Sequence, residues 1–392
     1  MGRLSLGVVA TTGKKHEKRV PLHPAHLPLL DADIRARLYL ERGYGRRFGL
    51  SDDDLRPHVA GVVPRAELIR DCEAVMLFKV TPQDVAELRE GQVLVGAPHF
   101  AQNMETTQLA IDKRLTVISL EAMRHWPTDG TRDRFAFYRV SEIAGYCSVQ
   151  HATQCVGRTG AWGRPLSAVV IGYGSTGRGA VAALRAQGVS ELSVVTRRPS
   201  ATVSPPAGTT RMGQLRYDPS RERDSTVLLA EGEVPLVAFL AEHDIVVNCA
   251  LQDLAAPEVY VTTGDLDRFA PGSLIVDVSC DKGMGFDWAR PTSFDQPTIT
   301  VGGNVHYYAV DHSPSLLWDS ATWEQSQSTL PYLPVLVDRE KWHTHETVRR
   351  AIEMRHGVVL NPGILSYQGR SPAYPHQPVT TRAADPVPLV GT

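Results

Sequence analysis

Leu166-Ser-Ala-Val-Val-Ile-Gly-Tyr-Gly-Ser-Thr-Gly-Arg-Gly-Ala180 is the stretch of this 392-residue chain from which a fold can first be predicted. The apolar residues 168–171 predict a buried strand, and the Ala-rich run that follows predicts a helix. The three glycines between them have the GxGxxG spacing of a turn that binds a dinucleotide pyrophosphate through free N–H groups of the helix. Gly-rich turns also occur without a ligand, so this is a hypothesis. Its candidate cofactor-binding residues are Gly172, Gly174, Ser175, Thr176 and Gly177.

The end of the next strand indicates which nucleotide the turn accepts. An NAD site usually carries an acidic residue there for the ribose 2′-hydroxyl, but this chain has Thr196, Arg197 and Arg198. Guanidinium groups bind a 2′-phosphate with charge-assisted hydrogen bonds, whereas a carboxylate would repel it. We therefore predict NADPH (NADP+) as the cofactor. The alternative is that the two arginines form a solvated strand end.

Length and composition exclude several classes of partner. A chain of this length suits two domains, and 41 Lys and Arg residues nearly balance 43 Asp and Glu residues. No general field therefore attracts nucleic acid or an anionic membrane. The sequence contains no run of about 18 to 20 apolar residues and no signal-peptide pattern at its start. We expect a cytoplasmic protein that acts on small molecules and forms a homo-oligomer.

The five cysteines do not predict a disulfide or a metal site. They are odd in number and scattered, and no pair has metal-ligand spacing, so we expect core thiols in a reducing compartment and no metal. These residues are Cys72, Cys147, Cys155, Cys249 and Cys280.

The order of elements predicts an α/β fold with two Rossmann-like lobes, each built on a parallel sheet, and a cleft between them. Strands and helices alternate up to about Leu120, and a long helix over 139–155 leads to the Gly-rich turn. After Val310 the pattern becomes helical, most clearly over 314–322 and 344–355. We predict a discontinuous substrate domain (1–140 and about 312–375), an NADP-binding domain (141–311) and a loose tail (376–392).

Two candidate catalytic residues end neighbouring strands of the first lobe. Lys79 follows an apolar run, and His99 lies just beyond the next strand. Parallel neighbours end at the same edge of a sheet, so both side chains are expected to face one pocket, where they can exchange protons. The alternatives are a lysine that reaches out to solvent and a turn histidine with local partners.

Two further charged residues lie at strand ends. Arg19, just beyond the first strand, can bind a substrate carboxylate with two parallel hydrogen bonds, although a solvated basic loop is the alternative. Asp281 follows a strand of the second lobe at the edge where ligands bind, and it can orient an amine or a cofactor ribose. Asp277 lies inside the apolar run and is expected to be structural.

The order of these pieces resembles the alanine dehydrogenase and pyridine nucleotide transhydrogenase superfamily over roughly residues 4–325. The resemblance rests on Glu17-Lys-Arg-Val-Pro-Leu22, Lys79, His99, the Gly-rich turn, 275–283 and 303–314. Within the superfamily, Asn248-Cys-Ala-Leu-Gln-Asp253 and Val310-Asp-His-Ser-Pro-Ser315 look more similar to the N5-(carboxyethyl)ornithine synthases, which are opine-forming reductases that use NADPH.

The resemblance implies roles for particular residues. Arg19 would bind the carboxylate of a 2-oxo acid, Lys79 and His99 would polarise its carbonyl and exchange protons, and Asp281 would assist at the nicotinamide. Alanine dehydrogenases have an Asn-Met-Pro motif where this chain has Asp311 and His312 before Ser-Pro. An acidic residue there can face the amino group of a second substrate, so both are candidate substrate-binding residues. The same resemblance implies that Cys249, Ala250 and Leu251 contact the cofactor.

The resulting hypothesis is an NADPH-dependent reductase of an imine formed from a small 2-oxo acid and the amino group of an amino acid. It gives an N-(carboxyalkyl) amino acid. The alternatives are an amino-acid dehydrogenase that uses ammonia, an enzyme similar to saccharopine dehydrogenase, and a sensor that binds NADP without turnover.

Overall fold

The computed structural model describes residues 2–126, 134–199, 202–205, 208–209, 211–217, 225–253 and 256–379. Its first sheet has eight strands in the order β21-β20-β6-β5-β4-β1-β2-β3. Six of them are parallel: β1 (Leu6–Val8), β2 (Leu38–Glu41), β3 (Gly61–Val63), β4 (Ala74–Lys79), β5 (Val93–Ala97) and β6 (Thr116–Ser119). The strand order reverses between β1 and β4, the point at which open α/β sheets bind ligands.

The second sheet repeats this order with a later part of the chain. Its nine strands run β13-β12-β11-β10-β9-β14-β16-β19-β18, and the order reverses between β9 and β14. The parallel strands are β9 (Ser167–Ile171), β10 (Glu191–Thr196), β11 (Arg211–Arg216), β14 (Ile245–Asn248), β16 (Leu274–Asp277) and β19 (Val305–Tyr308). The antiparallel strands are β12 (Thr226–Leu229), β13 (Gly232–Pro235) and β18 (Thr298–Val301).

Two short sheets, twelve α-helices and several short 3-10 helices are also present among the described residues. β7 (Arg124–His125) pairs with β8 (Arg134–Phe135), and β15 (Val259–Val261) pairs with β17 (Gly285–Phe286). The helices are α1 (Ala32–Arg35), α2 (Asp52–Leu55), α3 (Arg65–Asp71), α4 (Pro82–Glu87), α5 (Met104–Asp112), α6 (Tyr138–Cys155), α7 (Ser175–Ala186), α8 (Leu236–Ala241), α9 (Trp318–Thr329), α10 (Leu333–Leu336), α11 (Glu346–Ala351) and α12 (Pro362–Tyr367).

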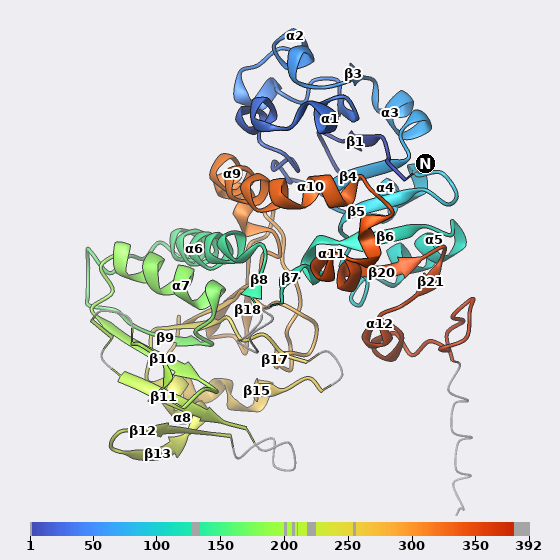
Figure 1. Ribbon diagram of the computed structural model, residues 1–392. Coiled ribbons are helices and arrows are strands. Elements are labelled where there is room, and N and C mark those ends of the chain that lie inside the picture. The colour runs from blue at the N-terminus through green and yellow to red at the C-terminus, as the bar shows by residue number, and fades with distance from the viewer. Residues whose placement is uncertain are drawn as a thin grey trace, which may run out of the picture.

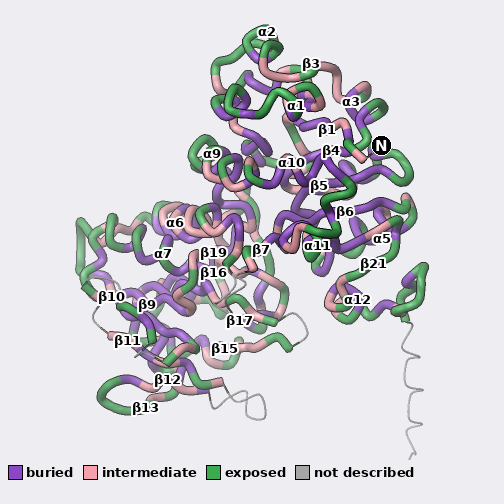
Figure 2. Tube along the Cα trace, in the orientation of Figure 1, coloured by how far each residue is buried: buried purple, intermediate pink, exposed green. Residues whose placement is uncertain are grey.

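Both sheets are buried on their two faces. Along β4, Ala74, Met76 and Phe78 pack into one apolar cluster, while the alternate residues Val75 and Leu77 pack into another. Strand β9 divides its residues between two clusters in the same way. The buried parts of the chain accordingly follow the strands (Figure 2). The predicted α/β fold with two mostly parallel sheets is confirmed.

The last described segments return to the first sheet. In Figure 1 the orange and red elements α9 to α12 lie beside the blue and cyan ones. Strand β20 (Ile352–Arg355) pairs antiparallel with β6, and β21 (Val358–Val359) extends the edge. Leu4 also donates its main-chain N–H to Val337 O (2.7 Å).

Three predictions about local structure were wrong. The helix expected over 344–355 ends at Ala351, because the following residues pair with the free edge of β6. The loose tail was predicted to begin at residue 376, but the chain is still packed there: His376 is 1% exposed, and its Nε2 accepts the N–H of Val359 (3.1 Å). Residues 380–392 lie outside the described part of the chain. All five cysteines are free, but Cys155 is exposed and is no core thiol.

The crossing of α6 and α7 predicts which glycines the fold requires. A Cβ atom at Gly145 would lie 1.9 Å from Thr176 O, and one at Gly179 would lie 1.7 Å from Glu142 O. Gly145→Ala should therefore push the helices apart and lower the free energy of unfolding by about 3 kcal/mol, the scale of overpacking. Urea denaturation measures this, with Gly264→Ala as the control, because a Cβ there first meets Thr262 Oγ1 at 3.7 Å. Equal midpoints for both variants would contradict the tight crossing.

Candidate functional site

The ends of β4 and β5 bring the two candidate catalytic residues together. Lys79 is the last residue of β4, and His99 follows β5 by two residues. The Lys79 Nζ lies 2.8 Å from His99 Nε2, so the two side chains are in direct contact. His99 has a φ of +47°, a left-handed conformation that is uncommon outside glycine and that recurs at functional sites.

The second ring nitrogen of His99 contacts a residue that was not predicted. Glu121, in the short 3-10 helix after β6, places Oε2 3.1 Å from His99 Nδ1 and accepts the main-chain N–H of His99 at Oε1 (2.9 Å). Because Lys79 donates to Nε2, the neutral ring carries its proton on Nδ1 and points it at Glu121. The surrounding protein and the adjacent Lys79 cation both lower the pKa of His99, which keeps the ring neutral at neutral pH.

Asp311, from the segment after β19, reaches this pair from the second sheet. Its Oδ2 accepts from Lys14 Nζ (2.7 Å), and its main-chain oxygen lies 3.4 Å from Lys79 Nζ. Burial opposes ionisation, but the hydrogen bond from His312 and the charges of Lys79 and Lys14 outweigh it and lower the pKa of Asp311. The Asp311 carboxylate is thus an anion held between cations.

The predicted substrate-binding residue His312 is engaged entirely by other groups of the protein. Its Nδ1 contacts Asp311 Oδ1 (2.7 Å), its Nε2 contacts Lys15 O (2.9 Å), and its ring packs edge-on against Phe294. The predicted substrate contact of His312 is therefore corrected: both ring nitrogens are engaged, and the side chain orients Asp311.

Arg19 is fixed by a buried ion pair. Its Nε and Nη2 donate to the two carboxylate oxygens of Glu17 (2.8 and 2.6 Å), and its guanidinium lies over the Phe78 ring at 4.3 Å. Burial opposes ionisation of Glu17, but Arg19 overcomes it and lowers the pKa of Glu17 to about 2. Arg19 is close enough to His99 for its charge to help lower the pKa of that ring. Glu17 does not contact the remaining guanidinium nitrogen, Nη1. That nitrogen can donate to a carboxylate.

Asp281 joins the same group of side chains. Burial raises its pKa, while a hydrogen bond from Gln102 and the nearby Lys79 act in the opposite direction. Asp281 follows β16 of the second sheet and Gln102 follows β5 of the first, so this contact also spans the two sheets. Asp277 has the predicted structural role, since it accepts hydrogen bonds from Tyr307 Oη (2.7 Å) and Asn248 Nδ2 (3.0 Å).

The Gly-rich turn fits a dinucleotide. Gly172 has a φ of +88°, and a Cβ there would lie 2.8 Å from Cys249 O. A Cβ at Gly177 would lie 2.0 Å from Gly172 O, which shows how closely α7 packs on the turn. At Gly174, by contrast, a Cβ meets nothing within 4 Å. This open space beside the start of α7 at Ser175 is where a pyrophosphate can approach the N–H groups.

The arginines after β10 are partly engaged by other groups. Arg197 Nη2 forms an ion pair with Glu258 Oε2, and Arg198 Nη2 donates to Tyr173 O (2.7 Å), beside the turn. Thr196 Oγ1 accepts the main-chain N–H of Arg198 (3.4 Å). The guanidinium groups therefore lie at the edge predicted for the ribose, and Arg197 would have to leave Glu258 to bind a phosphate.

The segment after β14 touches the turn through two of its three predicted residues. The main chain of Cys249 and Ala250 packs against Gly172, and Ser279 Oγ donates to Ala250 O (2.7 Å). Leu251 is 87% exposed. Burial raises the pKa of the Cys249 thiol, so it is a packing residue with no reactive thiolate.

Four residues of the site were missed from the sequence. Glu121 follows a predicted strand in the same way as Lys79 and His99, so the strand-end rule could have found it. Lys14 and Glu17 precede Arg19 in a basic loop, where the sequence spacing does not show which charges pair. Gln102 has no sequence signal that points to a role. Within the described ranges, no group of three or more His, Cys, Asp or Glu side chains is arranged to hold a metal ion. No helix of these ranges is long and apolar enough to cross a membrane.

Comparisons with known proteins agree with this geometry. The alanine dehydrogenase/PNT N-terminal domain model matches residues 7–144, and the corresponding C-terminal domain model matches residues 144–363. An alanine dehydrogenase of Mycobacterium tuberculosis is 25% identical over 92% of this chain and 96% of its own length. An N(5)-(carboxyethyl)ornithine synthase of Clostridium botulinum is 26% identical over 77% of this chain and 86% of its own length.

Solved structures share the fold. An L-alanine dehydrogenase superposes with a TM-score of 0.71 at 22% identity, covering 92% of this chain and 98% of its own. A transhydrogenase from Sinorhizobium meliloti gives a TM-score of 0.66 at 20% identity, covering 91% of this chain and 99% of its own. These matches confirm the predicted arrangement of the fold.

The buried Glu17–Arg19 pair predicts a stability effect. Glu17→Gln leaves the Arg19 charge without its partner and should lower the free energy of unfolding by about 3–5 kcal/mol at neutral pH. Since the pKa of Glu17 is lowered from its ordinary value of 4.5 to about 2, its stabilisation is fully present above 4.5 and is lost as the pH falls towards 2. Urea denaturation at pH 7 and at pH 3 measures both effects. Asp71→Asn, which breaks the exposed pair with Arg70, should leave the pH 7 midpoint unchanged; a Glu17→Gln midpoint equal to that control would contradict the pairing.

Proposed function

The chain belongs to the alanine dehydrogenase/PNT family, oxidoreductases that bind NAD(P) and act on amino-acid donors, and we propose that it reduces an imine with NADPH. The imine forms between a small 2-oxo acid, such as pyruvate, and the amino group of an amino acid. The product is an N-(carboxyalkyl) amino acid. The N-terminal sheet and the segments that return to it supply the substrate site, and the second sheet holds the nucleotide.

Asp311 carries this proposal. Its carboxylate lies beside the Lys79–His99 pair and contacts the Lys14 ammonium at 2.7 Å. A primary ammonium therefore fits against Asp311, and a second amino acid brings such a group into the pocket. Ammonia has no further group that the protein could bind, so a carboxylate at this position would improve its binding less than that of an amino acid.

Arg19, Lys79 and His99 suit the oxo acid. Arg19 Nη1 can donate to its carboxylate, and Glu17 holds the guanidinium so that little conformational freedom is lost on binding. Lys79 Nζ donates to His99 Nε2, which aims the ammonium at the space in front of the ring. Lys79 is therefore the proton donor, and neutral His99 orients it.

The reduction balances with these groups. Amine and oxo acid lose water to form the C=N bond, Lys79 gives one proton to the imine nitrogen, and the carbon receives a hydride, so that C=N becomes CH–NH. A bound nicotinamide dinucleotide supplies that hydride. Asp281 follows a strand of the second sheet, accepts a hydrogen bond from Gln102 and lies near Lys79. In this reaction it would orient the amine.

A specific observation favours a second candidate, reductive amination with ammonia. Relatives named alanine dehydrogenase cover more of this chain than those named N(5)-(carboxyethyl)ornithine synthase, at similar identity. The two reactions share the oxo acid, the hydride and the proton donor, and differ in the amine that Asp311 would meet.

The cofactor preference gives one prediction. Arg197→Ala should weaken NADPH binding about 10-fold or more, because a charge-assisted hydrogen bond to the 2′-phosphate is worth about 1.5–3 kcal/mol. NADH, which has no 2′-phosphate, should bind the variant as it binds the native protein. Nucleotide fluorescence titrated with protein measures both dissociation constants. The matched control is Arg216→Ala on β11, whose side chain pairs with Glu233. Equal affinity of the native protein for NADH and NADPH would contradict the preference.

The amine gives a second prediction. With NADPH and pyruvate, glyoxylate or 2-oxoglutarate, an amino acid with a free primary amine should support faster NADPH oxidation than ammonia. Asp311→Asn should then raise the KM for that amine about 10-fold or more, the scale of a lost charge-assisted hydrogen bond, with the KM of the oxo acid unchanged. If ammonia gives the best rate, the alanine dehydrogenase reaction is the function. If both KM values rise together, Asp311 does not bind the amine.

A further inference from the structure

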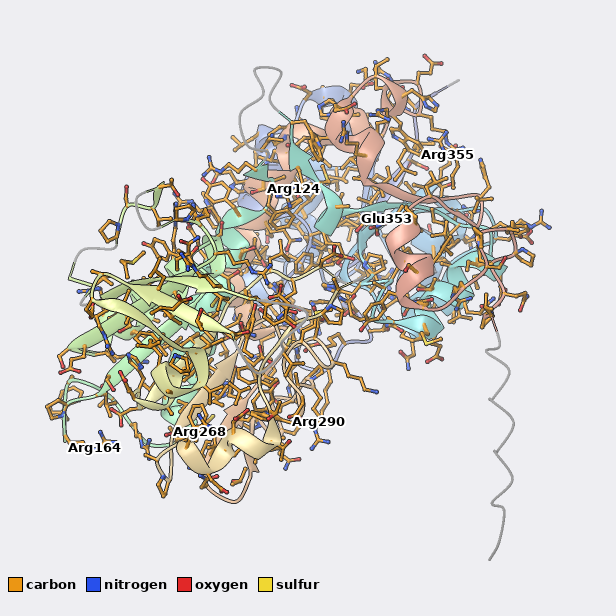
Figure 3. The ribbon with its side chains drawn as sticks, turned by 90° about the horizontal axis from the view of Figure 1, so that it is seen from below. Arg124, Arg164, Arg268, Arg290, Glu353 and Arg355 are labelled. Atoms are coloured by element: carbon orange, nitrogen blue, oxygen red, sulfur yellow. The ribbon has the colours of Figure 1, made fainter. Side chains whose placement is uncertain are left out.

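Two carboxyl groups from distant parts of the chain lie close enough to influence each other behind His99: Glu353 is buried and Glu121 is half-buried. Glu121 lies in the 3-10 helix after β6, and Glu353 lies on β20, the strand that pairs with β6. The pairing shifts register between Ile352 and Met354, so Glu353 is the extra residue of a bulge. Bulges redirect side chains and are common next to active sites. Figure 3 labels Glu353 where this late segment joins the first sheet.

The hydrogen bonds around the pair are incomplete. Glu353 is 8% exposed, and its Oε1 accepts from Asn361 Nδ2 (3.0 Å). Ser119 lies within reach of both carboxyls, yet its Oγ, Glu121 Oε2 and Glu353 Oε2 are buried oxygens without a well-formed hydrogen bond among the described residues. Buried polar atoms in native proteins normally have a partner. A proton held between these oxygens would supply the missing donor.

The local charges also favour one proton. Burial raises the pKa of Glu121, and the negative charge of Glu353 raises it further; burial also raises the pKa of Glu353. The groups that face the pair are the Lys79 ammonium, neutral His99, the Ser119 hydroxyl and the Asn361 amide. One nearby cation balances one carboxylate. A second negative charge in the same buried space would have no counterion among these groups.

We propose that Glu121 and Glu353 share a single proton, and that Glu353 is a positioning residue that keeps one negative charge on Glu121 against the N–H of His99. Glu121 is the better site for the charge, because it faces two donors of His99, the main-chain N–H and Nδ1. Glu353 holds the proton beside Asn361. The His99 ring is thereby fixed with Nε2 open to Lys79. The shared proton is independent of the proposed reaction, whereas its effect on catalysis rests on the proposed function.

Infrared spectroscopy tests the shared proton directly. At pH 7 the native protein should show the C=O stretch of a protonated carboxyl, which an ionised carboxylate lacks, and the band should disappear as the pH rises. Glu353→Gln should abolish it, because Glu121 then loses its negatively charged neighbour but keeps the nearby Lys79 cation and the hydrogen bond from the His99 main chain, which both favour its ionised form. Glu90→Gln, at an exposed pair with Arg114, should keep it. A native protein without the band, or a band that persists in Glu353→Gln, would overturn the proposal.

Two further measurements keep the test decisive if a variant is unstable. The folded pair keeps one proton up to a pH of about 8, whereas two unfolded glutamates have lost theirs above their ordinary pKa of 4.5. Unfolding between these pH values should therefore release about one proton, so stability falls as the pH rises. This dependence of stability on pH can be measured on the native protein without any variant. A stability that does not fall over this pH range would contradict the proposal. With any amine that turns over, Glu353→Gln should lose the alkaline limb of kcat/KM that the native protein shows. If no amino acid supports NADPH oxidation but the infrared band is present and disappears in Glu353→Gln, the proposed reaction is wrong and the shared proton is still supported.

Discussion

The Lys79 ammonium is the group through which the two sheets meet at the site. It donates to His99 Nε2 on the first sheet's edge and lies 3.4 Å from the main-chain oxygen of Asp311, which follows the last parallel strand of the second. Both sheets have the same strand order, and each reverses at one point. Ligands of open α/β sheets bind at such points. The side chains proposed to bind the substrate therefore gather at one reversal, and the Gly172 turn lies at the other.

Charge balance explains why the side chains stay in place. Lys14 offsets Asp311, and Glu17 offsets Arg19 in a pair that is almost completely buried. Lys79 lies close enough to the Asp311 carboxylate to help keep it ionised. Each cation that the proposed chemistry uses is thus already oriented by an anion, so less has to be reorganised when an oxo acid enters. The arrangement also explains why the site is built from strand ends, which hold such groups more rigidly than long loops do.

The predictable part of the site came from strand ends, and the missed part came from pairing between distant segments. Lys79 and His99 were found because parallel neighbours end at one edge, and the Gly172 turn because its spacing has a physical meaning. Glu353 was hidden by a wrong assignment: residues 352–355 continue a helical pattern, and only the open edge of β6 turns them into a strand. Glu17 was present in the quoted motif, but no spacing rule states that its carboxylate would hold Arg19. Tertiary pairing of charges cannot be read from one sequence.

The most direct measurement is a crystal structure of the protein with NADPH and pyruvate bound together. The nicotinamide ring should lie on the side of the Gly172 turn that faces Lys79, with the pyruvate carboxylate on Arg19 Nη1 and its carbonyl within hydrogen-bonding distance of Lys79 Nζ. Pyruvate bound elsewhere would contradict the central claim, for example in the surface pocket lined by His23, Phe48 and Trp318. A nicotinamide ring that faces away from Lys79 would contradict it equally.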